Sequence, residues 1–569
     1  MSNHSLSPSG LYQAFPLGTL LCLSAVILLT GLGLREPWPA DEPRFALIAR
    51  DMVETGQWFF PMRGGEIYPD KPPVFMWLIA LFYVMTGSLK VAFLLPSALA
   101  GMVTVGLVYD LGRRLWSVNT GFIAGLLLLF TVQFTLQAKT AQIDALVCVF
   151  ITLGCYGLLR FLLIDGLWRW YFLAWFAMGL GIITKGVGFL PALLLLPYLA
   201  YRLRTRHDEF ALPYQPSVWK WWLGPVVMLL AISLWFVPMY YLVSASDNPA
   251  LHAYRDNILF KQTVTRYADS WHHIKPFWYY LTSVIPVFWL PMSLALPWLI
   301  PAWWRAIKQL DARIILPAGW IVLLVIFFSM SPGKRGVYIL PALPMLALIS
   351  APYCAQLLSR RWLNWLIWGL CGVLTLLLFV AGVSALLEAS WIQHALDDNS
   401  VDVSGFFFAA STIGVISLIV SYRKAKWKSW VILMSGLWLI YSTWGYVLMG
   451  PMRTPETVFN TMQKILPEDS EIALVEFSEQ FILFSPYPVT HFGYHTPTDI
   501  QLQAANQWLE GQGTRYLLLA EPQLQASCFN PHLAEYVGFA HRRDWYVVNA
   551  KAKTNLCTLP AQPVQEYSR

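Results

Sequence analysis

Charged residues are scarce in this chain, and their scarcity indicates its class. Only 12% of the 569 residues are Asp, Glu, Lys or Arg, whereas 57% are hydrophobic. Soluble domains carry about 25% charged residues, so most of this chain must be buried among helices or surrounded by lipid. A nucleic-acid partner is disfavoured, because the modest net charge of +7 is concentrated in short loops and does not suggest a basic face on a soluble domain.

Cysteine motifs are also lacking. None of the seven cysteines has the CxxC spacing of a metal site, and five of them lie in apolar runs, where a buried small side chain is expected. Cys528 and Cys557 differ because both lie in the polar C-terminal region. If that region is extracytoplasmic, the two are expected to form a disulfide. A cleaved signal is not expected, since the run from Leu11 to Leu34 is long enough to span and lacks a clear small-residue cleavage site.

Long apolar runs are what the chain has in abundance. Most approach the roughly 17–25 residues that a membrane-spanning helix needs. Thirteen spans are predicted, at about 11–33, 92–111, 119–138, 142–164, 170–184, 187–203, 218–244, 276–302, 312–330, 337–358, 362–387, 404–422 and 429–449. The run Val74–Thr86 is predicted to lie at the outer interface, because counting it as a span would place the Arg-rich loops outside.

This topology predicts two domains. Residues 1–450 are expected to form a transmembrane catalytic domain, with large outer loops at 34–91 and 245–275. Residues 451–569 are expected to form a small extracytoplasmic α/β domain, because strand-like and helix-like runs alternate there. The strand-like runs are 472–477, 516–519 and 546–548, and the helix-like runs are 458–465 and 502–510. The predicted fold class is therefore a multi-pass α-helical membrane protein with juxtamembrane helices and a small C-terminal α/β domain.

Ionisable residues gather at the predicted outer ends of the apolar runs. They are Asp41, Glu42, Lys71, Asp144, Lys185, Arg266 and Lys334. Charge at membrane depth is costly, so such a gathering indicates a functional site. Cations can hold a phosphate leaving group, and a carboxylate can orient or deprotonate an acceptor. The pattern predicts transfer from a lipid-linked phosphate at one membrane face.

Several of these residues also have a purely structural explanation. Asp41 and Glu42 can act as a general base, orient an acceptor or bind a metal, or they can cap a helix that begins near Pro43. Lys71 can neutralise a phosphate or extend its ammonium to the interface. Lys185 can likewise neutralise a phosphate, or it can stabilise the end of a helix through the helix dipole.

Three further polar segments at the predicted outer face also allow a functional or a structural role. Asp144 follows a tight polar turn that brings a carboxylate close to the membrane plane, which favours a functional role. Lys334 and Arg335 lie between Gly and Pro residues and can grip phosphate oxygens. His272 and His273 can ligate a metal, but adjacent histidines point in different directions, which favours a structural role.

At these residues the chain resembles the lipid-linked-sugar glycosyltransferases of the GT-C class. It is most similar to the bacterial aminoarabinose transferase (ArnT) family, which is related to protein O-mannosyltransferases. The matching pieces are Pro39-Ala40-Asp41-Glu42-Pro43-Arg44-Phe45, Asp70-Lys71-Pro72, Asp144, Thr184-Lys185-Gly186, Arg266-Tyr267, Pro276-Phe277-Trp278-Tyr279-Tyr280, Gly333-Lys334 and Tyr338-Ile339-Leu340-Pro341. They appear in family order within roughly the first 345 residues.

The resemblance implies a GT-C fold and a role for each matching residue. It implies that Asp41 is the leading catalytic carboxylate and that Asp144 is a second essential acid. It also implies that Lys71, Arg266 and Tyr338 line the polyprenyl-phosphate site. A divalent metal near Asp41 and Asp70 is compatible with the family, with His272 as a further candidate ligand.

The implied activity is transfer of a sugar from undecaprenyl phosphate. In ArnT the sugar is 4-amino-4-deoxy-L-arabinose and the acceptor is a lipid A phosphate at the periplasmic face of the bacterial inner membrane, a change that gives resistance to polymyxin-like peptides. Asp70, Pro73 and the 333–337 loop depart from the family pattern, which bears on the sugar and acceptor. Protein hydroxyls or another glycan are alternative acceptors. A lipid flippase or transporter is disfavoured, because charge concentrates at one surface and no internal repeat stands out.

Overall fold

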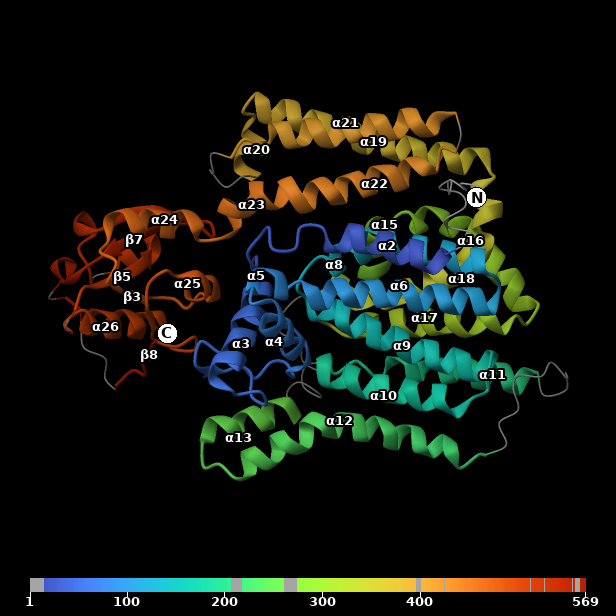
Figure 1. Ribbon diagram of the computed structural model, residues 1–569, viewed down its shortest axis with the longest axis horizontal. Helices are drawn as coiled ribbons and strands as arrows, with labels where there is room; N and C mark the ends of the chain where they lie inside the picture. The colour runs from blue at the N-terminus through green and yellow to red at the C-terminus, as the bar shows by residue number, and fades with distance from the viewer. Residues whose placement is uncertain are drawn as a thin grey trace, which may run out of the picture.

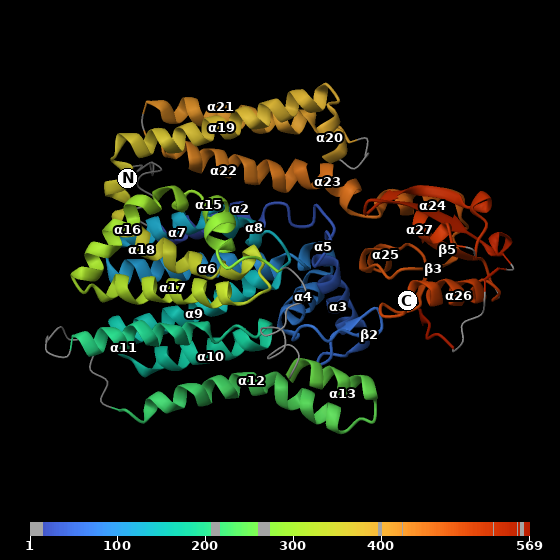
Figure 2. The ribbon, with the colours of Figure 1, turned by 180° about the vertical axis from the view of Figure 1, so that it is seen from behind.

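The computed structural model describes residues 15–205, 217–259, 274–395, 401–423, 425–511, 513–526, 528–554, 556–557 and 563–568. Long helices lie side by side in a bundle, and a smaller sheet-containing unit lies at one end of it (Figure 1). Seen from behind, α12 still flanks one side of the bundle, and α19, α21 and α22 flank the opposite side (Figure 2).

Seven helices in the described part of the chain are long and apolar enough to cross a membrane. They are Leu89–Leu115 with α5 (Leu89–Ala92) and α6 (Leu95–Leu115), α9 (Ile143–Leu163), α12 (Lys220–Ser244), α17 (Ala312–Met330), α19 (Arg361–Leu386), α21 (Ser404–Tyr422), and Lys428–Arg453 with α22 (Lys428–Ile440), η5 (Tyr441–Gly445) and α23 (Tyr446–Arg453). The chain is a membrane protein, whereas the count of thirteen spans stays a prediction.

Other predicted spans are helical but shorter. α2 (Pro16–Leu29) and α18 (Ala342–Leu358) are apolar helices of 14 and 17 residues. α10 (Trp168–Lys185) lies at the predicted span 170–184, and η1 (Leu190–Leu194) with α11 (Leu195–Arg204) lies at 187–203.

Two predicted spans are broken, and the two breaks meet. α7 (Val118–Leu129) and α8 (Val132–Ala138) are bent by 71°, and the segment formed by η3 (Tyr280–Val284) and α15 (Ile285–Phe288) is bent by 112° from α16 (Met292–Lys308). The backbone N–H of Val132 donates to the Leu290 carbonyl at 3.1 Å. A break inside a membrane leaves backbone groups that only protein can satisfy, so each break supplies a partner for the other.

The segment 34–91, predicted from the sequence to be an outer loop, lies between the bundle and the C-terminal unit (Figure 1). It contains α3 (Glu42–Thr55), the two-stranded pair β1 (Met62–Arg63) and β2 (Glu66–Ile67), and α4 (Val74–Thr86). α4 packs on α3, with the rings of Phe45 and Phe75 5.4 Å apart and edge to face. The run predicted as a surface helix is thus a helix, held by α3. Two further short helices are α13 (Pro249–Asp256), which follows α12, and α20 (Ser390–Ala395).

The C-terminal unit is built on a six-stranded sheet. Its strand order is β6-β7-β5-β3-β4-β8, with β3 (Glu471–Leu474), β4 (Val489–His491) and β5 (Arg515–Ala520) parallel, and β6 (Glu535–Ala540), β7 (Arg543–Val548) and β8 (Tyr567–Ser568) antiparallel. Its helices are α24 (Glu456–Ile465), α25 (Glu479–Phe484), α26 (Thr498–Trp508) and α27 (Glu521–Leu524), with short turns η6 (Pro531–Leu533) and η7 (Ala550–Ala552). β3 and β5 read as continuous apolar runs because central parallel strands are buried on both faces.

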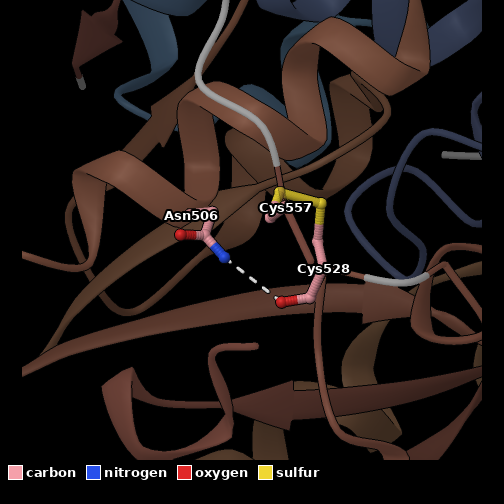
Figure 3. The surroundings of a disulfide bond; sticks show 3 residues. All are labelled: Asn506, Cys528 and Cys557. Atoms are coloured by element: carbon pink, nitrogen blue, oxygen red, sulfur yellow. Dashed lines mark hydrogen bonds between the residues drawn. A yellow bond between two sulfur atoms is a disulfide. The ribbon is translucent and has the colours of Figure 1, made fainter. Parts of the chain in front are cut away.

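The strand-like runs of the sequence form β3, β5 and β7, and the helix-like runs fall within or overlap α24 and α26. A disulfide joins Cys528 to Cys557, the pairing expected from the sequence (Figure 3). The Asn506 side chain donates to the Cys528 carbonyl at 3.2 Å. The bridge therefore ties the end of the chain to the loop after α27.

Candidate functional site

Asp41 precedes the first residue of α3 and does not cap that helix with its side chain. Its carboxylate lies between two cations instead. Arg44 Nη1 is 3.6 Å from one oxygen, and Arg335 Nη2 is 3.4 Å from the other. The Asp41 side chain is 23% exposed. An accessible carboxylate held by ion pairs can be presented to a substrate.

Glu42, the neighbouring acid, is buried and surrounded by donors. Arg35 donates to both of its oxygens, at 2.5 and 2.8 Å, and the backbone N–H groups of Trp38 and Ala141 donate at 2.8 and 2.9 Å. Four donors satisfy this carboxylate. This environment favours a structural role for Glu42, in contrast to the shared catalytic role expected from the sequence.

Asp144 pairs with Lys185 on a neighbouring helix. Asp144 lies in the first turn of α9, and Lys185 is the last residue of α10, where it forms an ion pair with the Asp144 carboxylate. Each charge also complements the dipole of its own helix. The Lys185 ammonium is 5.0 Å from the centre of the Tyr338 ring. Three residues predicted separately from the sequence therefore form one cluster.

The loop between α17 and α18 separates two adjacent cations. Lys334 is only 3% exposed, and its ammonium donates to the carbonyls of Lys275 and Ser331 at 2.9 and 2.5 Å. Arg335 next to it is 42% exposed and faces Asp41. The structure thus favours Arg335, which the motif comparison passed over, as the accessible cation of this loop.

One short turn joins the two acid–cation pairs. η4 (Gly336–Ile339) begins after Arg335 and contains Tyr338, whose backbone N–H donates to the Arg335 carbonyl at 3.1 Å. The side chain of Gln133 donates to the Gly336 carbonyl at 2.8 Å and accepts from Trp289 at 3.1 Å. The two broken helices therefore support the turn that places Arg335 beside Asp41 and Tyr338 beside Lys185.

Tyr68, which precedes Asp70 and Lys71, lies against two arginines. Tyr68 is buried, and the guanidinium groups of Arg44 and Arg63 lie 5.8 and 5.5 Å from its ring centre. Burial raises the pKa of Tyr68 to about 12, and the Asp70 carboxylate adds to the rise. Asp70 is exposed and Lys71 is half-buried.

Two predicted residues, Arg266 and His272, lie outside the described residues. Within the described part of the chain, no group of three or more His, Cys, Asp or Glu residues is arranged to hold a metal ion. Asp41 and Asp70 are therefore not members of such a group among the described residues.

Comparisons with known proteins show which family the chain resembles. The family model for dolichyl-phosphate-mannose-protein mannosyltransferases matches residues 70–236. An undecaprenyl phosphate-α-4-amino-4-deoxy-L-arabinose arabinosyl transferase of Pseudomonas fluorescens is 32% identical over 393 residues, which are 67% of this chain and 66% of the relative. A transferase of the same name from Sodalis glossinidius is 28% identical and covered to 70% in both chains. The chain thus spans about two thirds of the length of these relatives.

A solved structure gives the fold. ArnT from Cupriavidus metallidurans, bound to undecaprenyl phosphate, superposes with a TM-score of 0.71 at 20% identity, over 95% of this chain and all of that one. The chain belongs to the ArnT-like glycosyltransferases of the GT-C class. The ArnT-like fold accounts for the bundle, and the sheet-containing unit lies within the superposed part.

Sequence reasoning missed three residues that build this ArnT-like site. Arg35 is buried against Glu42 and against the rings of Trp38 and Tyr446. Arg44 stands within a matching motif but carried no role. Lys139 donates to the carbonyls of Ile27 and Thr30, at 2.8 and 3.0 Å, at the end of α2. The sequence signal available for all three was a cation within six residues of Asp41 or Asp144.

Proposed function

We propose that this enzyme transfers 4-amino-4-deoxy-L-arabinose from undecaprenyl phosphate to a phosphate of lipid A, at the periplasmic face of the bacterial inner membrane. The observation that carries the proposal is the joining of two acid–cation pairs, Asp41 with Arg335 and Asp144 with Lys185, by one short turn. The names of the relatives supply the donor and the sugar.

The transfer breaks the bond between the anomeric carbon of the sugar and a phosphate oxygen of the carrier. The carrier leaves as undecaprenyl phosphate, and an acceptor oxygen forms the new bond to the same carbon. Lys185 and Tyr338, with Lys71 and Arg266, are assigned to the carrier phosphate. A fixed cation there stabilises the charge that develops on the leaving oxygen.

Asp41 is assigned to the acceptor. Its carboxylate orients the attacking oxygen and accepts its proton where the acceptor is a hydroxyl or a protonated phosphate. Arg335 holds that carboxylate in the resting site and is close enough to meet the incoming acceptor phosphate. Glu42 fixes the backbone on which Asp41 stands, because its oxygens bind Arg35, Trp38 and Ala141.

A second acceptor class has its own support. The family model that matches residues 70–236 describes enzymes that act on proteins, which favours protein hydroxyls as the alternative. A phosphate acceptor is already nucleophilic near neutral pH, whereas a hydroxyl needs a base. Asp41→Asn is therefore expected to abolish transfer to a hydroxyl but to retain part of the transfer to a phosphate.

Mass spectrometry of lipid A tests the proposal. Cells that lack the chain should lose pentosamine-sized additions, and wild type should restore them whereas Asp41→Ala should not. Glu36→Gln is the matched control, because Glu36 lies in the same segment but pairs with the exposed Lys90 at 3.0 Å. Unchanged lipid A would reject this acceptor, and full activity of Asp41→Ala would reject the assignment of Asp41.

A further inference from the structure

Helix α25 of the C-terminal domain lies along α3, the helix that begins next to Asp41. Near the start of α25, the Gln480 side chain donates to the Pro37 carbonyl at 2.5 Å. Near its end, Arg50 of α3 donates to the Leu483 carbonyl at 3.0 Å. The C-terminal domain is therefore docked directly on the segment that carries the proposed catalytic carboxylate.

Arg44 links the two helices to Asp41. Its Nε donates to a carboxylate oxygen of Glu479 at 3.1 Å, while its Nη1 lies 3.6 Å from Asp41. Different nitrogens of one guanidinium thus contact the carboxylates of Glu479 and Asp41. The planar fork of Arg makes these contacts geometrically dependent on each other, because the group moves as a unit.

Glu479 is itself held in place. Its carboxylate lies 3.6 Å from Nη1 of Arg63, whose side chain is only 7% exposed. The guanidinium of Arg63 lies 3.4 Å from the Tyr494 ring centre, in the C-terminal domain. Glu479 therefore sits between two arginines from the outer segment, and its charge offsets both.

We propose that Glu479 is a positioning residue for Asp41 and acts through Arg44. This inference rests on the proposed role of Asp41 in the transfer. Without the Glu479 charge, Arg44 is repelled by Arg63 and shifts toward Asp41, which turns a loose ion pair into a direct hydrogen bond. The Asp41 carboxylate is then held away from the acceptor. The C-terminal domain thus contributes a side chain to the arrangement of the site.

Kinetics of a double-mutant cycle test the proposal. Glu479→Gln should lower kcat about tenfold with little change in KM for the lipid donor, because Lys185 and Tyr338 of the proposed carrier-phosphate site lie on α10 and η4. Arg44→Met should also lower kcat. In the Arg44→Met enzyme, the further effect of Glu479→Gln should shrink to about twofold or less, since the two residues act as one unit.

Glu476→Gln is the matched control. Glu476 lies three residues before Glu479, and its carboxylate pairs with Arg543 and accepts from Gln523 inside the C-terminal domain. Its loss should leave kcat within about twofold of wild type. Losses that multiply in the double mutant, or equal losses in the two Gln variants, would overturn the positioning role.

Hydrogen–deuterium exchange gives a readout that does not depend on turnover. Glu479→Gln should change the exchange rates of the amides of residues 37–45, because Arg44 shifts within this segment, and Glu476→Gln should not. Unchanged exchange in both variants would reject the inference even if the donor were a different sugar. A wild-type enzyme that fails to use the aminoarabinose donor would reject the proposed function, while the exchange comparison would still decide the role of Glu479.

Discussion

The Glu42 carboxylate accepts a hydrogen bond from the backbone N–H of Ala141 at 2.9 Å, across 99 residues of sequence. Glu42 follows Asp41, and Ala141 lies three residues before Asp144. The contact therefore fixes the separation of the two acids that the sequence singled out. The same carboxylate neutralises Arg35, whose side chain is 1% exposed.

Glu42→Gln should destabilise the protein. The change leaves the buried Arg35 cation without its counter-charge, and breaking such a pair costs about 3–5 kcal/mol. Thermal unfolding in detergent measures the loss. Glu36→Gln should shift the unfolding temperature little, because its partner Lys90 is exposed to solvent. Equal stability of the two variants would contradict the structural role of Glu42.

Substitutions of the adjacent residues Lys334 and Arg335 should affect different properties, stability for Lys334 and activity for Arg335. Arg335→Gln should lower transfer by about 100-fold with normal stability, because a charge facing Asp41 is lost where catalytic charge develops. Lys334→Met should lower stability by about 1–3 kcal/mol, because two loop carbonyls lose their donor. Activity per folded molecule and unfolding temperature separate the two effects. A larger activity loss for Lys334→Met than for Arg335→Gln would reverse the assignment.

Asp144 and Lys185 should affect carrier binding in opposite directions. Asp144→Asn removes the acid that competes with a phosphate for Lys185, so undecaprenyl phosphate should bind a few-fold more tightly while kcat falls. Lys185→Gln should weaken binding about tenfold or more, because a charged hydrogen bond contributes about 1.5–3 kcal/mol. Competition by undecaprenyl phosphate in the transfer assay measures both. Weaker binding in Asp144→Asn would argue that the acid shapes the phosphate site.

His541 should make the C-terminal domain sensitive to acid. Burial, followed by the Arg543 charge, lowers the pKa of His541 to about 4, below its ordinary value of 6.5. Between these values the unfolded chain binds a proton that the folded domain does not. Stability is therefore full above pH 6.5 and falls by up to about 3 kcal/mol as the pH drops to 4.

His541→Asn should flatten this dependence. His541 has a φ of 56°, and Asn tolerates that backbone conformation better than most residues, so the variant removes the titrating ring without backbone strain. Unfolding of the detergent-solubilised protein between pH 4 and 7 provides the measurement. An unchanged slope in the variant would assign the acid sensitivity to other groups.

Hydropathy and loop charge predict the helices of the bundle because long apolar runs have few alternatives in a membrane. They cannot predict the breaks at Thr131 and Leu290, since each bent pair of helices is, taken together, long and apolar enough for one span. The short β4 and β8 strands and β6 were also missed. β4 and β8 are only three and two residues long, and they pair with each other between positions distant in sequence, Thr490 with Ser568.

The site residues were also predicted only in part from the sequence. The motifs bring forward Asp41, Asp144, Lys185 and Tyr338, which the structure gathers around one turn. The sequence pattern could not show that Lys334 is buried and Arg335 exposed, because the conformation of the loop decides which of two adjacent side chains points inward. The sequence also could not predict that Arg44 pairs with Glu479, because Glu479 lies 435 residues away in another domain.

The docking of α25 on α3 has a consequence for biosynthesis. Arg50 and Leu483, which bond to each other, lie 433 residues apart. During translation the helix next to Asp41 is therefore made long before the helix that holds it, and its contacts with α25 form only after the C-terminal domain has been synthesised and folded. A chain that stopped after α23 would lack the contacts at Pro37, Arg44 and Arg50. Full activity is therefore expected only after the C-terminal domain has folded onto α3.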